Sequence, residues 1–293
     1  TTHPAQDAAT TEDCEALLSF IETWGWEWPV LAPKLILGWI GCALICGALK
    51  WRPHLWITGT KGSGKSTLDG LIANILGDLA VHVQGSTTEP GLRQVLNGDA
   101  RPVLFDEFEA ENSNAKAVID AARSAASDNA APVDKGTPEG KPIFYRLRFA
   151  AMFSGIIANV QRDADKSRMV ILEMHPLKRD ESQRRRLIDG LDRFADNFGP
   201  GLLRRMLDSL TNGELDAALA TLRTAIRLEG GDERKADVFA HLLAASHVLT
   251  RDDALTEDEA RTQAALITEL DVDEPSDEEA CLSHLIGHRV KVE

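Results

Sequence analysis

The sequence is poor in cysteine, and its few cysteines follow no pattern that points to a site. The four residues, Cys14, Cys42, Cys46 and Cys281, form no C-x-x-C pair and lie near no histidine cluster. Neither a zinc site nor a disulfide framework is therefore indicated. Because disulfide-poor chains are typical of reducing environments, we expect a cytoplasmic protein.

Long hydrophobic runs are also lacking, and no secretory signal is visible. The most apolar stretch, residues 35–49, has 15 residues. A bilayer-spanning helix needs roughly 20. We predict a buried helix there and expect no membrane partner.

Positive charge is in short supply, with 32 Lys and Arg against 46 Asp and Glu and a net charge of −14. The imbalance is uneven. Residues 251–280 hold 12 acidic residues against two arginines, whereas residues 135–186 hold 12 basic residues against six acidic ones. The net charge therefore does not exclude a local basic surface for nucleic acid.

One stretch fits the pattern G-x-x-x-x-G-K-[ST] of a phosphate-binding loop. Its residues are Gly59, Thr60, Lys61, Gly62, Ser63, Gly64, Lys65 and Ser66, with Thr67 following. Glycines let successive backbone N–H groups point at a polyphosphate. Lys65 is predicted to contact the β- and γ-phosphates and Ser66 to hold Mg²⁺. An apolar stretch at 54–58 predicts the preceding strand, and residues 66–76 predict the following helix.

Two acids end the apolar strand predicted at 101–107. An acid at the end of a strand adjacent to the phosphate loop supports the Mg²⁺ shell, and we assign this role to Asp106. Glu107 is placed to polarise an attacking water as a general base. The pair favours hydrolysis of ATP over simple nucleotide binding. A solvated acidic turn is the alternative interpretation.

Two later residues complete the candidate catalytic set. Asn159 ends a predicted apolar strand and can reach the γ-phosphate or the water. Arg168 precedes another predicted strand and could stabilise phosphate charge in a neighbouring subunit, with Arg162 as a second choice. A strand-terminal turn and a surface salt bridge are the respective alternatives.

Strands that alternate with helices up to about residue 180 predict an α/β protein with a mostly parallel sheet covered by helices, a P-loop NTPase core. We expect an N-terminal helical segment at 1–50, the ATPase core at 51–180 and a C-terminal helical lid or appendage at 181–293. Trp24, Trp26 and Trp28 are expected to pack between helices rather than stack on a base. The chain stops just after an apparent element begins, which suggests a piece of a longer polypeptide.

The ordered series of Gly59–Ser66, Val103–Glu107, Asn159 and Asp163-x-Asp165-x-x-Arg168 resembles AAA+ ATPases of the helicase kind. It is similar to superfamily 3 viral helicases and to the helicase domains of phage and plasmid primase–helicases. The resemblance covers about residues 50–210.

This resemblance implies a hexameric ring that binds ATP at subunit interfaces and single-stranded DNA in its channel. It also implies a DNA-tracking hairpin before the Asn159 strand, where Lys135 and Lys141 flank a glycine-bearing tip. Two lysines there suit sequence-independent phosphate contact. Arg204 or Arg205 would sense nucleotide from the lid, although the local pattern departs from the usual lid motif.

The function predicted from sequence is an ATP-hydrolysing DNA helicase or translocase core of a phage- or plasmid-type replication protein. Two alternatives remain open. One is a nucleotide-switched AAA+ assembly, such as a loader or a defence module without unwinding activity. The other is a P-loop kinase for a small molecule, against which the adjacent acids argue.

Overall fold

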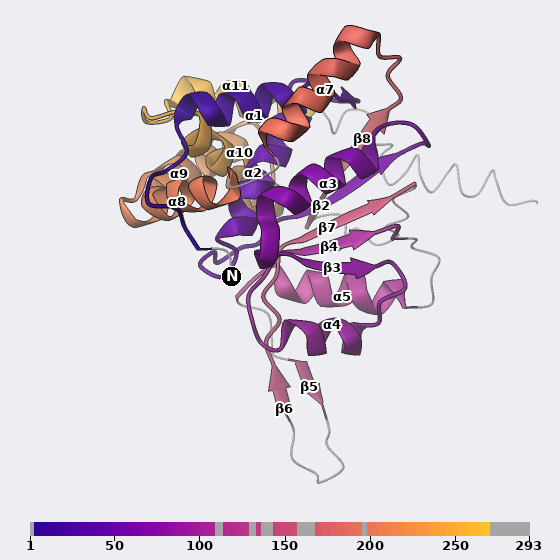
Figure 1. Ribbon diagram of the computed structural model, residues 1–293. Coiled ribbons are helices and arrows are strands. Elements are labelled where there is room, and N and C mark those ends of the chain that lie inside the picture. The colour runs from indigo at the N-terminus through magenta and orange to yellow at the C-terminus, as the bar shows by residue number, and fades with distance from the viewer. Residues whose placement is uncertain are drawn as a thin grey trace, which may run out of the picture.

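A mostly parallel sheet organises the protein in the computed structural model (Figure 1). The structure describes residues 3–108, 114–128, 146–156, 168–194 and 198–269, together with the backbone of 133–135 and 143–145. In these residues the sheet has six strands in the order β1-β8-β2-β7-β4-β3. The strands are β1 (Gly25–Trp26), β2 (His54–Gly59), β3 (Val81–Gln84), β4 (Val103–Asp106), β7 (Ala151–Gly155) and β8 (Met169–His175). Only β1 is antiparallel to its neighbour among them.

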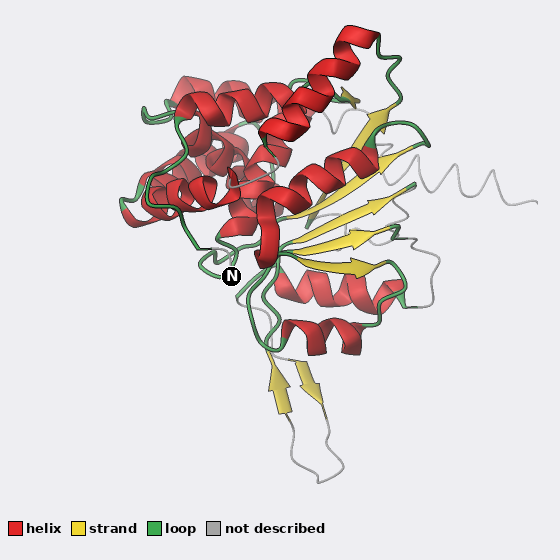
Figure 2. Ribbon diagram, in the orientation of Figure 1, coloured by secondary structure: helices red, strands yellow, loops and turns green. Residues whose placement is uncertain are grey.

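Helices cover both faces of this sheet, which confirms the predicted α/β class (Figure 2). α3 (Lys65–Leu76) lies over one face, and α4 (Glu89–Leu96) and α5 (Ala115–Ala125) lie over the other. Alternate strand residues face opposite ways. Accordingly Leu55 and Ile57 join the core beneath α3, whereas Trp56 joins the core beneath α5.

The remaining helices form one body beside the sheet. They are α1 (Thr11–Ile21), α2 (Ala32–Leu44), α7 (Glu181–Arg193), α8 (Phe198–Thr211), α9 (Glu214–Leu228), α10 (Glu233–Thr250) and α11 (Glu257–Glu269). The predicted apolar helix is α2, and all but one of its residues are buried. It packs on α10 so closely that a Cβ at Gly38 would lie 1.8 Å from the Leu242 carbonyl oxygen. The first and last helical segments therefore share one hydrophobic core. No helix in the described ranges is long and apolar enough to cross a bilayer.

A small antiparallel pair, β5 (Val133–Lys135) and β6 (Ile143–Tyr145), projects away from the rest of the molecule (Figure 1). This antiparallel pairing agrees with the hairpin expected around Lys135 and Lys141. Its tip lies outside the described residues.

Candidate nucleotide-binding site

The phosphate loop connects β2 to α3, as its motif requires. Gly62 and Gly64 have φ angles of +88° and +91°, a left-handed backbone that disfavours side chains. Gly64 is the N-cap of α3, and the Ser63 N–H donates to the Thr60 carbonyl oxygen at 3.1 Å. The glycines thus turn the chain tightly from the strand into the helix.

The loop presents positive charge and backbone donors that suit an anion. Lys65 Nζ donates to the Gly59 carbonyl oxygen at 3.4 Å. No ion pair with a carboxylate is found for Lys65 in the described part of the chain. The first N–H groups of α3 have no intrahelical acceptors, and the helix dipole adds positive potential there. A Cβ at Gly62 would meet nothing within 4 Å, so the loop is open on that side. The residues therefore fit a polyphosphate.

Asp106 is the last residue of β4, so it lies at the carboxyl ends of the parallel strands, as the phosphate loop does. β4 and β7 pair Phe105 with Phe153, and β2 and β7 pair Ile57 with Ser154. Asp106 therefore lies level with Ser154 and Ile57. The expectation that β4 is adjacent to β2 is wrong, because β7 lies between them. Two strand spacings separate the loop strand from Asp106, about 10 Å.

Asp69, which the sequence motifs do not point to, is bound to β7 at the level of Asp106. Its Oδ2 accepts a hydrogen bond from Ser154 Oγ at 2.6 Å, and its Oδ1 is buried with no hydrogen-bond partner. Burial raises the pKa of Asp69 to about 6; the Ser154 bond and Lys65 oppose this shift, and Asp106 adds to it. Both charges therefore affect the pKa of Asp69. It lies four residues after Lys65 on α3, so the helical period places both on one face.

Glu107 follows Asp106 in a left-handed conformation with φ +50°, and its side chain is exposed. Few non-glycine residues adopt positive φ, and those that do are enriched at functional sites. Gly85 makes this turn possible, because a Cβ there would lie 2.2 Å from the Glu107 carbonyl oxygen. The Phe108 N–H donates to the Ser154 carbonyl oxygen at 2.8 Å and anchors the turn to β7.

The oxygen donors at this edge fit a nucleotide-borne Mg²⁺. Ser66 lies in the first turn of α3 and is exposed, and Asp106 is exposed. No group of three or more His, Cys, Asp or Glu side chains converges on a metal position in the described ranges. Because Mg²⁺ keeps several waters and is usually held by one or two protein oxygens plus substrate phosphates, Ser66 and Asp106 suffice.

Arg168 lies at the amino ends of the strands, immediately before β8 begins. Its carbonyl oxygen accepts from the His54 N–H at 3.4 Å, at the start of β2. The six residues of β2 separate that point from the phosphate loop, a span of about 20 Å. Arg168 therefore does not join the phosphate loop of this chain. Asn159, Arg162 and Lys141 lie outside the described residues, and of Lys135 only the backbone is described.

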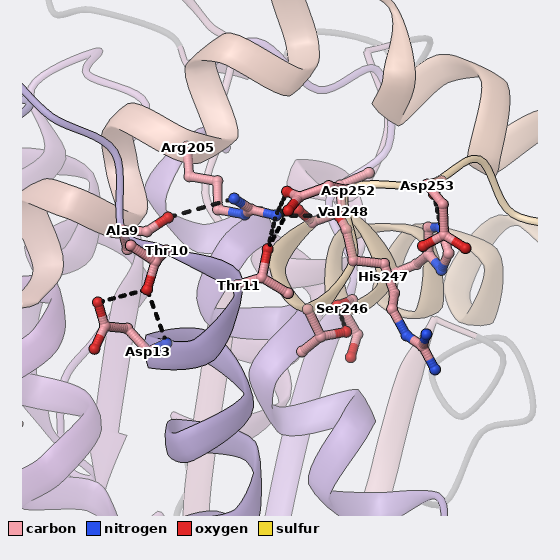
Figure 3. A network of polar contacts seen from close by, with 12 residues as sticks. Ala9, Thr10, Thr11, Asp13, Arg205, Ser246, His247, Val248, Asp252 and Asp253 are labelled. Atoms are coloured by element: carbon pink, nitrogen blue, oxygen red, sulfur yellow. Dashed lines mark hydrogen bonds and ion pairs between the residues drawn. The ribbon is translucent and has the colours of Figure 1, made fainter.

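Arg204 and Arg205 are engaged within the helical body. Arg204 pairs with Asp208 at 2.9 Å. Arg205 donates to the Val248 carbonyl oxygen at 2.9 Å and pairs with Asp252 at 2.6 Å, joining α8 to the end of α10 (Figure 3). It also donates to Thr11 Oγ1 at 3.1 Å. These contacts engage both arginines within the helical body, and their expected role as a nucleotide sensor stays a prediction.

The tryptophan turn lies against the phosphate loop. Trp24 and Trp26 are 3% and 5% exposed, as expected for packing rather than base stacking. Trp24 also donates from Nε1 to the Gly64 carbonyl oxygen at 3.1 Å. Arg179, which precedes α7, lies near the same ring, with Cζ 5.9 Å from its centroid. Neither contact has a signal in the local sequence, because Trp24 lies 40 positions from Gly64 and 155 positions from Arg179.

Comparison with known proteins finds solved structures of similar fold. No protein-family model matches the chain, and no curated protein matches its sequence. Among solved structures, an active helicase titled SCCmec type IV Cch matches with a TM-score of 0.57 at 16% identity, over 92% of this chain and 50% of that one. A putative ATPase from Cytophaga hutchinsonii matches with a TM-score of 0.48 at 10% identity, over 96% of each chain. The chain thus spans half the length of the Cch helicase.

The strand order, the phosphate loop between β2 and α3, and the likeness to the Cch helicase agree with one another. The chain has an α/β fold with a phosphate loop between β2 and α3, and it shares this fold with the Cch helicase.

Proposed function

We propose that this chain is the ATP-hydrolysing core of a DNA helicase or translocase from a phage- or plasmid-type replication protein. The observation that carries the proposal is the position of Asp106, which ends β4 at the end of the sheet where the phosphate loop leaves β2. The cationic loop and the acid at the end of β4 therefore serve a single site. The fold of the Cch helicase supports the wider assignment.

Each proposed role follows from the chemistry of the side chain. Lys65 and the N–H groups of the loop bind the β- and γ-phosphates, and Ser66 and Asp106 hold Mg²⁺ through oxygen. When bound, Mg²⁺ neutralises charge on the phosphates. Glu107 orients the attacking water and accepts its proton. Asn159 contacts the γ-phosphate, and Arg168 acts on the site of a neighbouring subunit.

Single-stranded DNA and a homo-oligomeric, hexameric ring are the proposed partners. The protruding hairpin of β5 and β6 carries Lys135 on its first strand and Lys141 before its second. Their ammonium groups would contact DNA phosphates without reading sequence. Replacing both lysines by alanine should abolish strand unwinding while leaving basal ATP hydrolysis unchanged. Intact unwinding in this double variant would remove the hairpin from the DNA site.

The direct test of the whole function is the ATPase rate and the native mass, each with and without single-stranded DNA. We expect hydrolysis that DNA stimulates and a mass several times that of one chain. Ring formation with slow turnover and no response to DNA would instead favour a nucleotide-switched loader or defence module. A phosphorylated small-molecule product would favour a kinase.

A further inference from the structure

A second cation lies beside the phosphate loop. Arg179 belongs to the segment that joins β8 to α7, immediately before the Asp180 cap of that helix. A Cβ at Gly64 would lie 3.8 Å from Arg179 Nη1. Gly64 is the N-cap of α3, so the guanidinium lies next to the positive end of that helix.

The groups that hold the guanidinium in the described part of the chain are neutral. Its Nη2 donates to the Thr23 carbonyl oxygen at 3.2 Å, and its other contact is the ring of Trp24. No carboxylate forms an ion pair with Arg179 across the described ranges. Trp24 in turn donates to the Gly64 carbonyl oxygen, so one side chain holds both the loop and the arginine.

Such an arrangement of positive groups suits the binding of an anion. Arg179, the N-terminus of α3 and Lys65 carry charge of the same sign and lie close together in the fold, and each is partly removed from water. Negative charge that binds among them would be attracted by all three. Guanidinium is also the side chain best suited to phosphate oxygens, since its N–H groups can bond two of them at once.

We propose that Arg179 binds the phosphates of the nucleotide held by its own subunit. This inference rests on the proposed function, and it assigns Arg179 a role in cis that differs from the role of Arg168 in trans. The nearby Trp24 is the positioning residue, because it fixes the guanidinium against the loop.

The test is the dissociation constant of ATP and of inorganic tripolyphosphate for Arg179→Ala, Arg179→Lys and the wild-type chain. Loss of a charged hydrogen bond to phosphate should weaken both ligands about 10- to 100-fold in Arg179→Ala. Arg179→Lys should recover part of the loss because it restores the charge. Lys178→Ala, the exposed neighbour, is the matched control and should bind both ligands as the wild type does.

Equal losses for ATP and tripolyphosphate would support a phosphate contact, since tripolyphosphate has no base or ribose. Unchanged constants in Arg179→Ala, or a loss confined to ATP, would overturn the proposal. Thermal melting of the ligand-free variant checks that Trp24 still packs. The proposed function fails if the wild type binds no nucleotide. If the wild type hydrolyses ATP and Arg179→Ala binds equally well, only this inference fails.

Discussion

At the scale of single residues, the side chains proposed for catalysis differ in where the fold places them. Lys65 and Asp106 lie at the end of the sheet where β2 and β4 end, and both affect the pKa of Asp69. Arg168 lies at the edge where β2 begins. An arginine so placed does not reach the phosphate loop of its own chain, and the proposal therefore gives it a role at the site of a neighbouring subunit.

Replacing Arg168 by alanine should therefore lower the ATPase rate about 10³-fold or more. Mixing this variant with Lys65→Ala should restore part of the activity. In a mixed ring, an intact loop from one chain meets an intact arginine from the other. The measurement is the steady-state ATPase rate of each variant and of the mixture. A mixture no more active than its parts would show that Arg168 does not act across an interface.

His54 gives a residue-scale prediction about stability. It is fully buried; its Nδ1 accepts from the Ala151 N–H at 3.0 Å, and its Nε2 lies 2.7 Å from the Ala122 carbonyl oxygen. Burial lowers the pKa of His54 from 6.5 to about 4. Between these pH values the unfolded chain binds more protons than the folded one. The stability that neutral His54 contributes is therefore complete above pH 6.5 and declines as the pH falls toward 4.

Urea unfolding at about pH 7 and pH 4.5 measures this contribution. From the pKa difference, the wild type should lose about 2 kcal/mol more than His54→Gln over that interval. His82→Gln, an exposed histidine on β3, should lose as much as the wild type. An equal loss in His54→Gln and the wild type would contradict the assignment.

At the scale of elements, the turn after β4 depends on the turn after β3. The Gly85 N–H donates to the Asp106 carbonyl oxygen at 2.8 Å, and the missing Cβ of Gly85 leaves room for the backbone of Glu107. The absence of a side chain at Gly85 thus allows the left-handed conformation of Glu107, the proposed base.

Gly85→Ala should move Glu107 away from its position, because the new Cβ would lie 2.2 Å from the Glu107 carbonyl oxygen. Misplacing a catalytic group by about 1 Å can cost about 100-fold in rate. We expect kcat to fall by about that factor while the dissociation constant for ATP stays near the wild-type value. Gly70→Ala on α3, where a Cβ would meet nothing within 4 Å, is the control. A normal kcat in Gly85→Ala would show that the turn tolerates displacement.

The elements also show what sequence reasoning can reach. Local patterns predicted β2, the phosphate loop and α3 because the loop chemistry and the flanking apolar runs are contiguous. They did not predict that β7 separates β2 from β4, since lateral strand order is set by long-range packing. The start of α7 at Glu181 is a local feature, because Asp180 and Gln183 form a capping box there.

At the scale of the whole molecule, α1 and α2 form one helical body with α8 to α11 against the six-stranded sheet (Figure 1). α2 packs on α10 through Gly38, and the Cys42 thiol lies 3.4 Å from the His241 carbonyl oxygen. Such proximity between segments about 200 positions apart could not be read from periodicity. Nor could the approach of Arg179 to Gly64, for which no local pattern exists.

Gly38→Ala should destabilise the protein, because its Cβ would lie 1.8 Å from the Leu242 carbonyl oxygen and the two helices must separate. Overpacking of this kind costs about 1–3 kcal/mol. Gly70→Ala makes the same change in an open helical position and should instead stabilise by about 0.5–1 kcal/mol. Denaturant midpoints of both variants measure the contrast. Equal midpoints would mean that α2 and α10 do not pack this tightly.

The central claim is that Lys65, Asp106 and Glu107 form one site for ATP hydrolysis. Glu107→Gln tests it most directly, because the change removes the proton acceptor and preserves size. The measurement pairs the dissociation constant for Mg²⁺–ATP with the single-turnover rate of hydrolysis. We predict unchanged binding and a rate lowered at least about 100-fold. Hydrolysis at the wild-type rate would contradict the account.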